Sequence, residues 1–312
     1  MKNKNHHIPD TYQSLSEAMS VLGASVPQHP LIALVNGIDQ QLNFKSPEND
    51  HVLNFYKISF RPQIGGKLKY GQTYFDFNEG GMLFAAPNQI IGVSKDVNKS
   101  EPDCIQQQIT LLIDPDFLYG YSLSKKIKDY NYFSYTANEA LYLSDKEKDV
   151  IISIFRIIED ELNSRVDEFS HDVIISQIEL LLNYANRFYK RQFITRKQVN
   201  TTLLEKVEIV LETYFNDQKR VNNGLPTVQY LADQVHLSAS YLSDMLRSLT
   251  GQSAQQHIHN KLIENAKLKL STTNLTVSEI AYELGFEHSQ SFSKLFKRKT
   301  KQSPLTFREQ FN

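Results

Sequence analysis

The C-terminal fold is decided by one stretch, residues 276–300, which reads TVSEIAYELGFEHSQSFSKLFKRKT. Thr276 is followed three residues later by Glu279, and this capping box predicts the start of a helix. Gly285 predicts its end, because glycine readily takes the left-handed conformation that a sharp turn requires. From Phe292 onward, apolar residues recur at helical spacing and predict a second helix. The stretch therefore predicts a helix-turn-helix.

The second helix of this unit has a polar and basic outer face. That face consists of Ser289, Gln290, Ser293, Lys294 and Lys297. Hydroxyl, amide and ammonium groups are those that bind base edges in the major groove and backbone phosphates. A plainer interpretation is an amphipathic helical hairpin with a solvated charged face.

The same pattern occurs a second time upstream, which favours the DNA-binding interpretation. Residues 231–237 align with residues 280–286. The second copy then has one extra residue, after which residues 241–247 align with residues 291–297. The two segments are therefore copies of one unit.

A single long helix is predicted between the two copies. A capping box of Ser253 and Gln256 opens an apolar stripe that continues to Leu270. A helix of about 18 residues spans roughly 27 Å, close to one turn of duplex DNA. One chain can therefore present two reading helices to one side of a duplex.

These residues resemble the AraC/XylS family of bacterial transcription regulators. The resemblance rests on Ile280-Ala281-x-x-x-Gly285-Phe286, Ser291-Phe292-Ser293-x-x-Phe296-Lys297 and Ser303-Pro304-x-x-x-Arg308. It implies a DNA-binding domain over residues 202–312, in which the first turns of the two second helices approach the bases. The implied contacts are Ser240, Ser243, Asp244 and Arg247 in the first copy and Ser289, Gln290, Ser293 and Lys294 in the second, with Lys297 and Arg298 adding positive charge.

Two residues depart from the family pattern. Lys301 stands where the family usually has glycine, and a lysine at positive φ is uncommon. Asp244 stands where a basic residue is frequent; it repels phosphate but can accept a hydrogen bond from cytosine. The second reading helix is therefore the stronger prediction.

Composition fits a soluble two-domain protein. The chain has 312 residues, 40% of them hydrophobic, and a net charge of −1. It shows no run of 18 apolar residues and no apolar signal-peptide core, so we expect a cytoplasmic protein without membrane contact.

The single cysteine, Cys104, excludes an internal disulfide and a cysteine-rich zinc site. Residues 289–312 carry six basic side chains against Glu309 alone, a net charge of +5 that favours phosphate binding.

Short β-type runs dominate the segment after residue 30. They lie at residues 31–35, 52–60, 67–77, 82–86, 90–93 and 105–113 and are separated by glycine- and asparagine-rich turns. This pattern predicts a small antiparallel barrel or sandwich, hence an α+β protein whose C-terminal domain is all-α. By resemblance, the barrel is a cupin-like sensor domain.

The barrel is interpreted as a binding cavity without catalysis. Its histidines do not show the spacing of a metal site, and the chain lacks a phosphate loop, a Gly-x-Ser-x-Gly motif and a CxxC pair. We therefore expect no enzyme activity, metal or cofactor. The expected lining is Tyr56, Tyr70, Gln72 and Tyr74, which suits a small polar or aromatic effector. An equally good interpretation is that these tyrosines do not line a ligand cavity and only cap the hydrophobic core.

The remaining boundaries follow from periodicity. Residues 1–30 are expected to be flexible, 31–115 to form the barrel, and 116–190 to be helical. Two amphipathic helices, at 144–162 and 169–189, are candidates for a homodimer contact or for packing on the barrel. A linker is expected over 191–201.

The sequence thus predicts a one-component regulator of promoter DNA that senses a small molecule. The resemblance to the family favours activation over repression. RNA polymerase is a candidate partner. The rival hypotheses are a protein-interaction module without DNA affinity and a metal-dependent cupin-type enzyme with a helical appendage.

Overall fold

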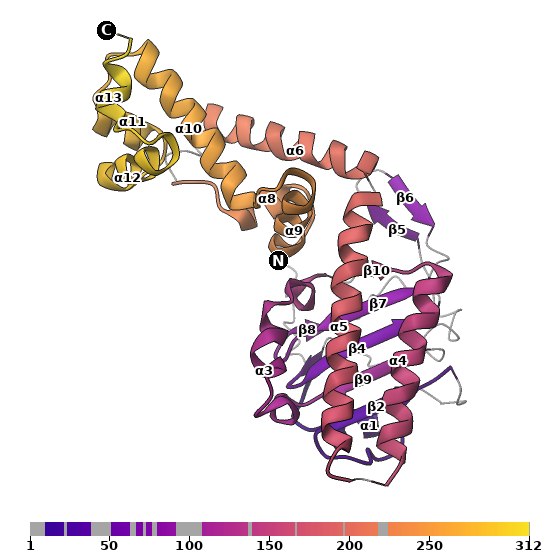
Figure 1. The fold of residues 1–312 in the computed structure, drawn as a ribbon. Coiled ribbons are helices and arrows are strands. Elements are labelled where there is room, and N and C mark those ends of the chain that lie inside the picture. Colours follow the sequence, from indigo (N-terminus) through magenta and orange to yellow (C-terminus); the bar gives the residue numbers. More distant parts are fainter. Residues whose placement is uncertain are drawn as a thin grey trace, which may run out of the picture. The chain divides into compact units, whose positions relative to one another are not determined.

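The chain folds into two compact units, Met1–Gln192 and Phe193–Asn312 (Figure 1). The computed structural model describes residues 10–21, 24–38, 51–62, 67–70, 73–76, 80–91, 108–136, 139–165, 167–195, 197–217 and 224–311. Sheets lie in the first unit and helices make up the second, so the protein is α+β as the sequence predicts. Cys104 and Gln72 lie outside the described residues.

A five-stranded antiparallel sheet with the strand order β10-β7-β4-β9-β2 forms the base of the N-terminal unit. Its strands are Ile32–Asn36 (β2), Tyr56–Arg61 (β4), Gly81–Ala85 (β7), Ile109–Ile113 (β9) and Leu141–Tyr142 (β10). A second sheet pairs Asp10–Tyr12 (β1), His51–Leu53 (β3) and Ile90–Ile91 (β8). Among the described residues these sheets stay open, so the closed barrel remains a prediction.

Two strands expected from the sequence are divided in the structure. The run 52–60 is split between β3 and β4, which belong to different sheets, because Phe55 turns into the core and is fully buried. The run 67–77 is a hairpin of Lys67–Tyr70 (β5) and Thr73–Asp76 (β6), with Tyr70 paired to Thr73. The prediction of one continuous strand there is wrong.

One face of the five-stranded sheet is covered by helices. Figure 1 shows Asp145–Asn163 (α4) and Ser170–Thr195 (α5) crossing the strands on this face. The ring of Phe84 in β7 lies 6.2 Å from that of Tyr189 in α5 and 4.6 Å from that of Tyr132. Short helical turns lead from β9 towards β10; they are Pro115–Leu118 (η1), Leu123–Lys126 (α3), Ile127–Asp129 (η2) and Asn131–Ser134 (η3). The two predicted helices are therefore present and bury their apolar stripes on the sheet.

The opposite face is partly covered by the N-terminal helix Leu15–Val21 (α1). Leu15, Ala18 and Met19 are buried there against Ala33 in β2 and Leu112 in β9. The sequence predicts a loosely held start with only a weak helical tendency at residues 15–22. In the structure this piece forms α1, which is stabilised because its apolar side chains are buried on the sheet.

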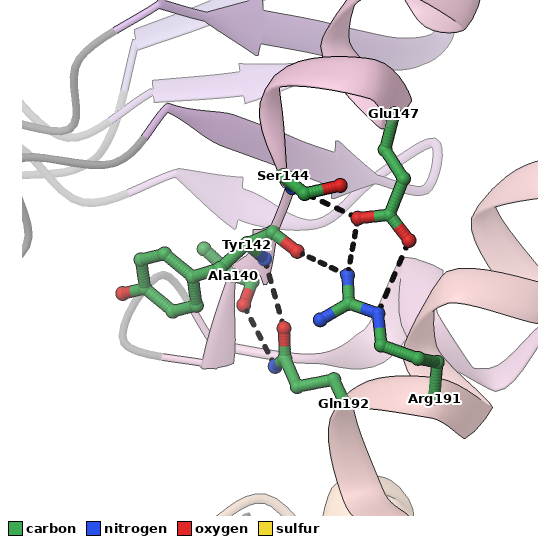
Figure 2. Close-up of polar contacts among 6 residues, drawn as sticks. All are labelled: Ala140, Tyr142, Ser144, Glu147, Arg191 and Gln192. Atoms are coloured by element: carbon green, nitrogen blue, oxygen red, sulfur yellow. Dashed lines mark hydrogen bonds and ion pairs between the residues drawn. The ribbon is translucent and has the colours of Figure 1, made fainter. Parts of the chain in front are cut away.

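A polar cluster fastens the end of α5 to the sheet (Figure 2). Arg191 donates through Nε and Nη2 to the Glu147 carboxylate, at 3.1 and 2.7 Å, and through Nη2 to the Tyr142 carbonyl at 2.8 Å. Gln192 accepts from the Tyr142 N–H at 2.8 Å and donates to the Ala140 carbonyl at 3.2 Å. Arg191 and Gln192, expected in a solvated linker, are thus part of the N-terminal unit.

The C-terminal unit is built from helices. They are Lys197–Asn216 (α6), Val228–Gln234 (α8), Ala239–Thr250 (α9), Ala254–Thr272 (α10), Val277–Glu283 (α11), Ser289–Thr300 (α12) and Pro304–Arg308 (α13). α10 begins at the predicted capping box of Ser253 and Gln256 and is the long helix expected between the two copies. In the described part of the chain, no helix combines the length and apolar character needed to cross a membrane.

The Gln192→Ala substitution tests the cluster at the end of α5. Gln192 is 1% exposed, so its loss removes two buried hydrogen bonds, one to the Tyr142 N–H and one to the Ala140 carbonyl. We expect the free energy of unfolding of the N-terminal unit to fall by about 1–3 kcal/mol, measured by urea denaturation. Lys190→Ala, an exposed change on the same helix, is the control. Equal stability of the two variants would contradict the proposed role of Gln192.

Candidate nucleic-acid interface

Both copies of the repeat begin with a capped helix. The Thr227 hydroxyl accepts a hydrogen bond from the Tyr230 N–H at 3.0 Å at the start of α8. At the start of α11, the Thr276 hydroxyl accepts from the Glu279 N–H at 3.2 Å, and the Glu279 carboxylate accepts from the Thr276 N–H at 2.6 Å. These bonds hold the pKa of Glu279 below its usual range. The capping box predicted at Thr276 is confirmed.

The turn of each copy is made by one left-handed residue. His236 has φ = 59° after α8, and Gly285 has φ = 89° after α11. The next residue then returns its N–H to the preceding helix, from Leu237 to Ala232 at 2.9 Å and from Phe286 to Ala281 at 3.0 Å. The sequence alignment of the two turns is therefore a structural equivalence.

Apolar side chains from both helices of the second copy meet beneath the turn. Phe286 is buried and its ring lies 5.5 Å from that of Phe292, which in turn lies 5.8 Å from Phe296. Ile280 and Leu284 of the preceding turn join this cluster. Burial of the apolar side leaves the polar side of α12 at the surface, as the periodicity predicts.

Both second helices end at another left-handed residue. Gly251 has φ = 75° after α9, and Lys301 has φ = 68° after α12. The two N–H groups bond in the same way, from Gly251 to Arg247 and from Lys301 to Lys297, each at 2.9 Å. Lys301 thus reproduces the glycine turn, at the steric cost that a Cβ imposes in this conformation.

The outer face of α12 is exposed and positively charged. Gln290, Lys294, Lys297 and Arg298 are exposed, and Ser289 and Ser293 are partly exposed. All six predicted residues of the second copy therefore lie on one short helix that contains no acidic residue. This face attracts phosphate and offers donors and acceptors to base edges.

The corresponding face of α9 is nearly neutral. Ser240 and Ser243 are partly exposed, and Asp244 forms an ion pair with Arg247 at 3.0 Å. The carboxylate is the more buried partner, with 19% of its side chain exposed against 56% for the guanidinium. Arg247 therefore points along its own helix towards Asp244. At the two equivalent positions the second copy has lysines, Lys294 and Lys297.

α10 adds a contact that the sequence did not reveal. The Lys299 ammonium donates to the Asn260 amide oxygen at 3.0 Å, which links α12 to α10. Burial lowers the pKa of neighbouring His259, and Lys299 and Arg298 lower it further. His259 is therefore neutral at neutral pH and adds no charge to the basic strip. Helical periodicity shows which residues of α10 are buried, but not which of its polar residues face α12.

Of the predicted effector residues, the described ones lie on three different strands. Tyr56 is buried in the core, where its ring lies 5.2 Å from that of Phe133, and burial raises its pKa. Tyr70 lies on β5 and Tyr74 on β6. Among described residues there is no group of three or more side chains suited to a metal ion.

Comparison with known proteins finds a family model within the C-terminal unit and several transcription regulators among the relatives. A family model described as "Helix-turn-helix domain" matches residues 231–310. The chain is 29% identical over 143 residues to the uncharacterized HTH-type transcriptional regulator YfiF of Bacillus subtilis (strain 168), covering 46% of this chain and 42% of that protein. It is 26% identical over 147 residues to the Msm operon regulatory protein of Streptococcus mutans, covering 46% and 52%.

One solved structure similar to this chain contains DNA. It is the DNA-binding domain of AdpA in complex with a target DNA, with 26% identity and a TM-score of 0.30, covering 35% of this chain and 91% of that one. The chain spans about half or less of the length of the two curated relatives.

The left-handed turn after α12 is tested by Lys301→Gly. Glycine removes the Cβ that is unfavourable at φ = 68°, so we expect the C-terminal unit to gain about 1 kcal/mol in free energy of unfolding, measured by urea denaturation. Lys294→Gly is the matched control. It also replaces a lysine with glycine, but inside the helix, where a loss of about 1 kcal/mol is expected. Destabilisation by both substitutions would show that Lys301 is not strained.

Proposed function

Because the chain carries a helix-turn-helix domain of the AraC type at its C-terminus, we propose that the whole protein is a one-component transcription regulator. The domain binds promoter DNA through both copies of the repeat, and the N-terminal unit modulates that binding. The observation that carries this proposal is the exposed face of α12, where hydroxyl, amide and basic groups follow one another on a helix without acidic residues.

The two copies have different tasks in this proposal. α12 reads bases with Ser289, Gln290 and Ser293, while Lys294, Lys297 and Arg298 bind phosphates. α9 presents Ser240, Ser243, Asp244 and Arg247. Its ion pair reduces its attraction for phosphate, so α9 contributes less affinity than α12 and selects at most a few bases.

The N-terminal unit is proposed to be a cupin-like sensor that forms a homodimer. Ile157 in α4, together with Val173 and Leu180 in α5, is exposed, whereas most apolar residues of these two helices are buried. Exposed apolar side chains on neighbouring helices support pairing of two chains. Activation through RNA polymerase in the cytoplasm is the form of regulation that we propose, with repression as the alternative.

Selection of bound duplexes from a random DNA pool tests the function directly. The full-length protein should enrich a motif with two short blocks about one helical turn apart, because two reading helices separated by α10 face one side of DNA. A single block would assign α9 to phosphate binding. No enrichment at low or high salt, by the full chain or by residues 202–312, would refute DNA recognition.

Lys294→Ala should weaken binding to specific and non-specific duplexes alike. The ammonium is exposed on α12 and is proposed to bind a phosphate, so the dependence of log K on log salt should lose about one unit of slope. Lys125→Ala, an exposed lysine of the N-terminal unit, is the control for net charge. Fluorescence anisotropy at several salt concentrations measures both. An unchanged slope would place phosphate binding elsewhere.

Gln290→Ala should change selectivity more than affinity. A glutamine in the first turn of a reading helix hydrogen-bonds base edges, and its loss should relax preference at one base pair by about 1–3 kcal/mol. Repeating the duplex selection with the variant measures this change, and Gln310→Ala, an exposed glutamine outside α12, is the control. An identical motif for both variants would exclude Gln290 from base readout.

A further inference from the structure

The turn after each second helix has the same hydrogen bonds in both copies of the repeat. The Thr250 and Thr300 hydroxyls each donate to the carbonyl four residues earlier, at 2.8 Å. The same hydroxyls accept from the N–H groups of Gln252 and Gln302, at 3.2 and 3.4 Å. The backbone of each glutamine is therefore fixed relative to the helix before it.

In each copy this glutamine binds an amide group eight residues later. Gln252 Oε1 accepts from Asn260 Nδ2 at 2.7 Å, and Gln302 Oε1 accepts from Gln310 Nε2 at 3.0 Å. Asn260 lies in α10 and Gln310 follows α13, so each turn is tied to the segment after it. The equal spacing makes this bond a feature of the repeated unit.

Asn260 also binds the second copy. Its Oδ1 accepts from Lys299 Nζ, in the last turn of α12, at 3.0 Å. The amide thus uses its donor for the first copy and its acceptor for the second. Gln252, Asn260 and Lys299 form a polar chain, the Asn260 bridge, which runs from the end of α9 across α10 to the end of α12.

The bridge restrains α12 in a way that apolar packing does not. Leu262, Ile263 and Ala266 of α10 are buried in one cluster with Phe292 and Phe296 of α12. Burial of apolar surface is non-directional, whereas a hydrogen bond weakens steeply when its angle changes. Because Asn260 precedes the apolar contact along α10, the bridge is a second point of attachment that limits rotation of α12 about the first.

We propose that Asn260 is a positioning residue that sets the separation of α9 and α12 and thereby selects one spacing between the two blocks of the DNA site. The inference rests on the proposed function, in which both copies contact one duplex. One additional base pair moves the second block by about 3.4 Å along the duplex and about 35° around it. With the bridge intact, α12 follows such a displacement only by breaking a hydrogen bond, so the protein discriminates against the longer spacing.

A rival interpretation makes Lys299 a phosphate-binding residue whose contact with Asn260 is incidental. Lys299 is exposed and follows Arg298 in the basic strip of α12. Under that interpretation, loss of its ammonium weakens binding to every duplex equally, and loss of the Asn260 amide changes nothing. The Asn260→Ala substitution keeps every charge of α12, so it separates the two interpretations.

Fluorescence anisotropy measures the spacing preference of the full-length protein. The probes are the selected duplex and the same duplex with one base pair added or removed between its blocks. For Asn260→Ala we expect the preference for the selected spacing to fall by about two- to tenfold, the factor that one hydrogen bond accounts for. Lys299→Met should lower it as well, and the double variant should lower it no further than Asn260→Ala alone, since both substitutions break one bridge. Gln310→Ala removes the equivalent bond within the second copy and is the matched control, which should keep the preference.

Two results would overturn the proposal. One is an unchanged spacing preference in Asn260→Ala or in Lys299→Met. The other is an equal fall in Gln310→Ala, which would assign the effect to the turns themselves and not to the bridge.

A distance measurement without DNA keeps this inference apart from the proposed function. Spin labels are placed at two exposed sites, with Ser248→Cys in α9 and Glu287→Cys ahead of α12, in the full-length protein carrying Cys104→Ser. Pulsed electron paramagnetic resonance should give a broader distance distribution after Asn260→Ala and an unchanged one after Gln310→Ala. An equal width with and without Asn260 would overturn the inference even where DNA binds. Failure to enrich any duplex would refute the proposed function, while the widths would still decide whether Asn260 holds the two copies.

Discussion

One left-handed residue at each turn determines the geometry of the helix-turn-helix repeat. At His236 and Gly285 the chain leaves one helix and brings the next N–H back to it, so a buried side chain closes the turn. The angle between the two helices follows from this turn, and that angle decides which side of the second helix is buried. The exposed faces of α9 and α12 therefore depend on a conformation that occupies one residue per copy.

The two copies meet this constraint with different residues. The first uses histidine at its turn and glycine after α9, whereas the second uses glycine at its turn and Lys301 after α12. Each copy thus accepts one unfavourable left-handed side chain, which costs roughly 1–2 kcal/mol. The packing of Phe286, Phe292 and Phe296 offsets this cost in the second copy. The backbone of the unit is preserved by packing even where its sequence pattern is not.

Local signals explain why the C-terminal unit could be predicted and parts of the N-terminal unit could not. Caps, periodicity and the repeat lie within a few residues of the features they specify, so α10, α11 and α12 are found where the sequence places them. In contrast, the division of residues 52–60 between two sheets depends on where Phe55 is buried, and this is a tertiary effect. The same holds for Arg191, whose basic surroundings suggested a linker although its partner Glu147 lies 44 residues away. The residues of β4 alternate between the two faces of the sheet, and the contact of Phe84 with Tyr189 identifies the face that meets the helices.

The pairing of the sheet connects Arg61, at the end of β4, to the end of α5. Arg61 is paired with Gly81, Gly81 with Tyr142, and the Tyr142 carbonyl with Arg191. There is little free space beside this path. A methyl group at Gly80 would lie only 2.5 Å from the Arg61 carbonyl oxygen. A ligand acts through such a path only if it binds two arrangements of the strands unequally. Since Arg191 and Gln192 are the last residues of the N-terminal unit, a change in the pairing of these strands would reach the point where the chain enters the C-terminal unit.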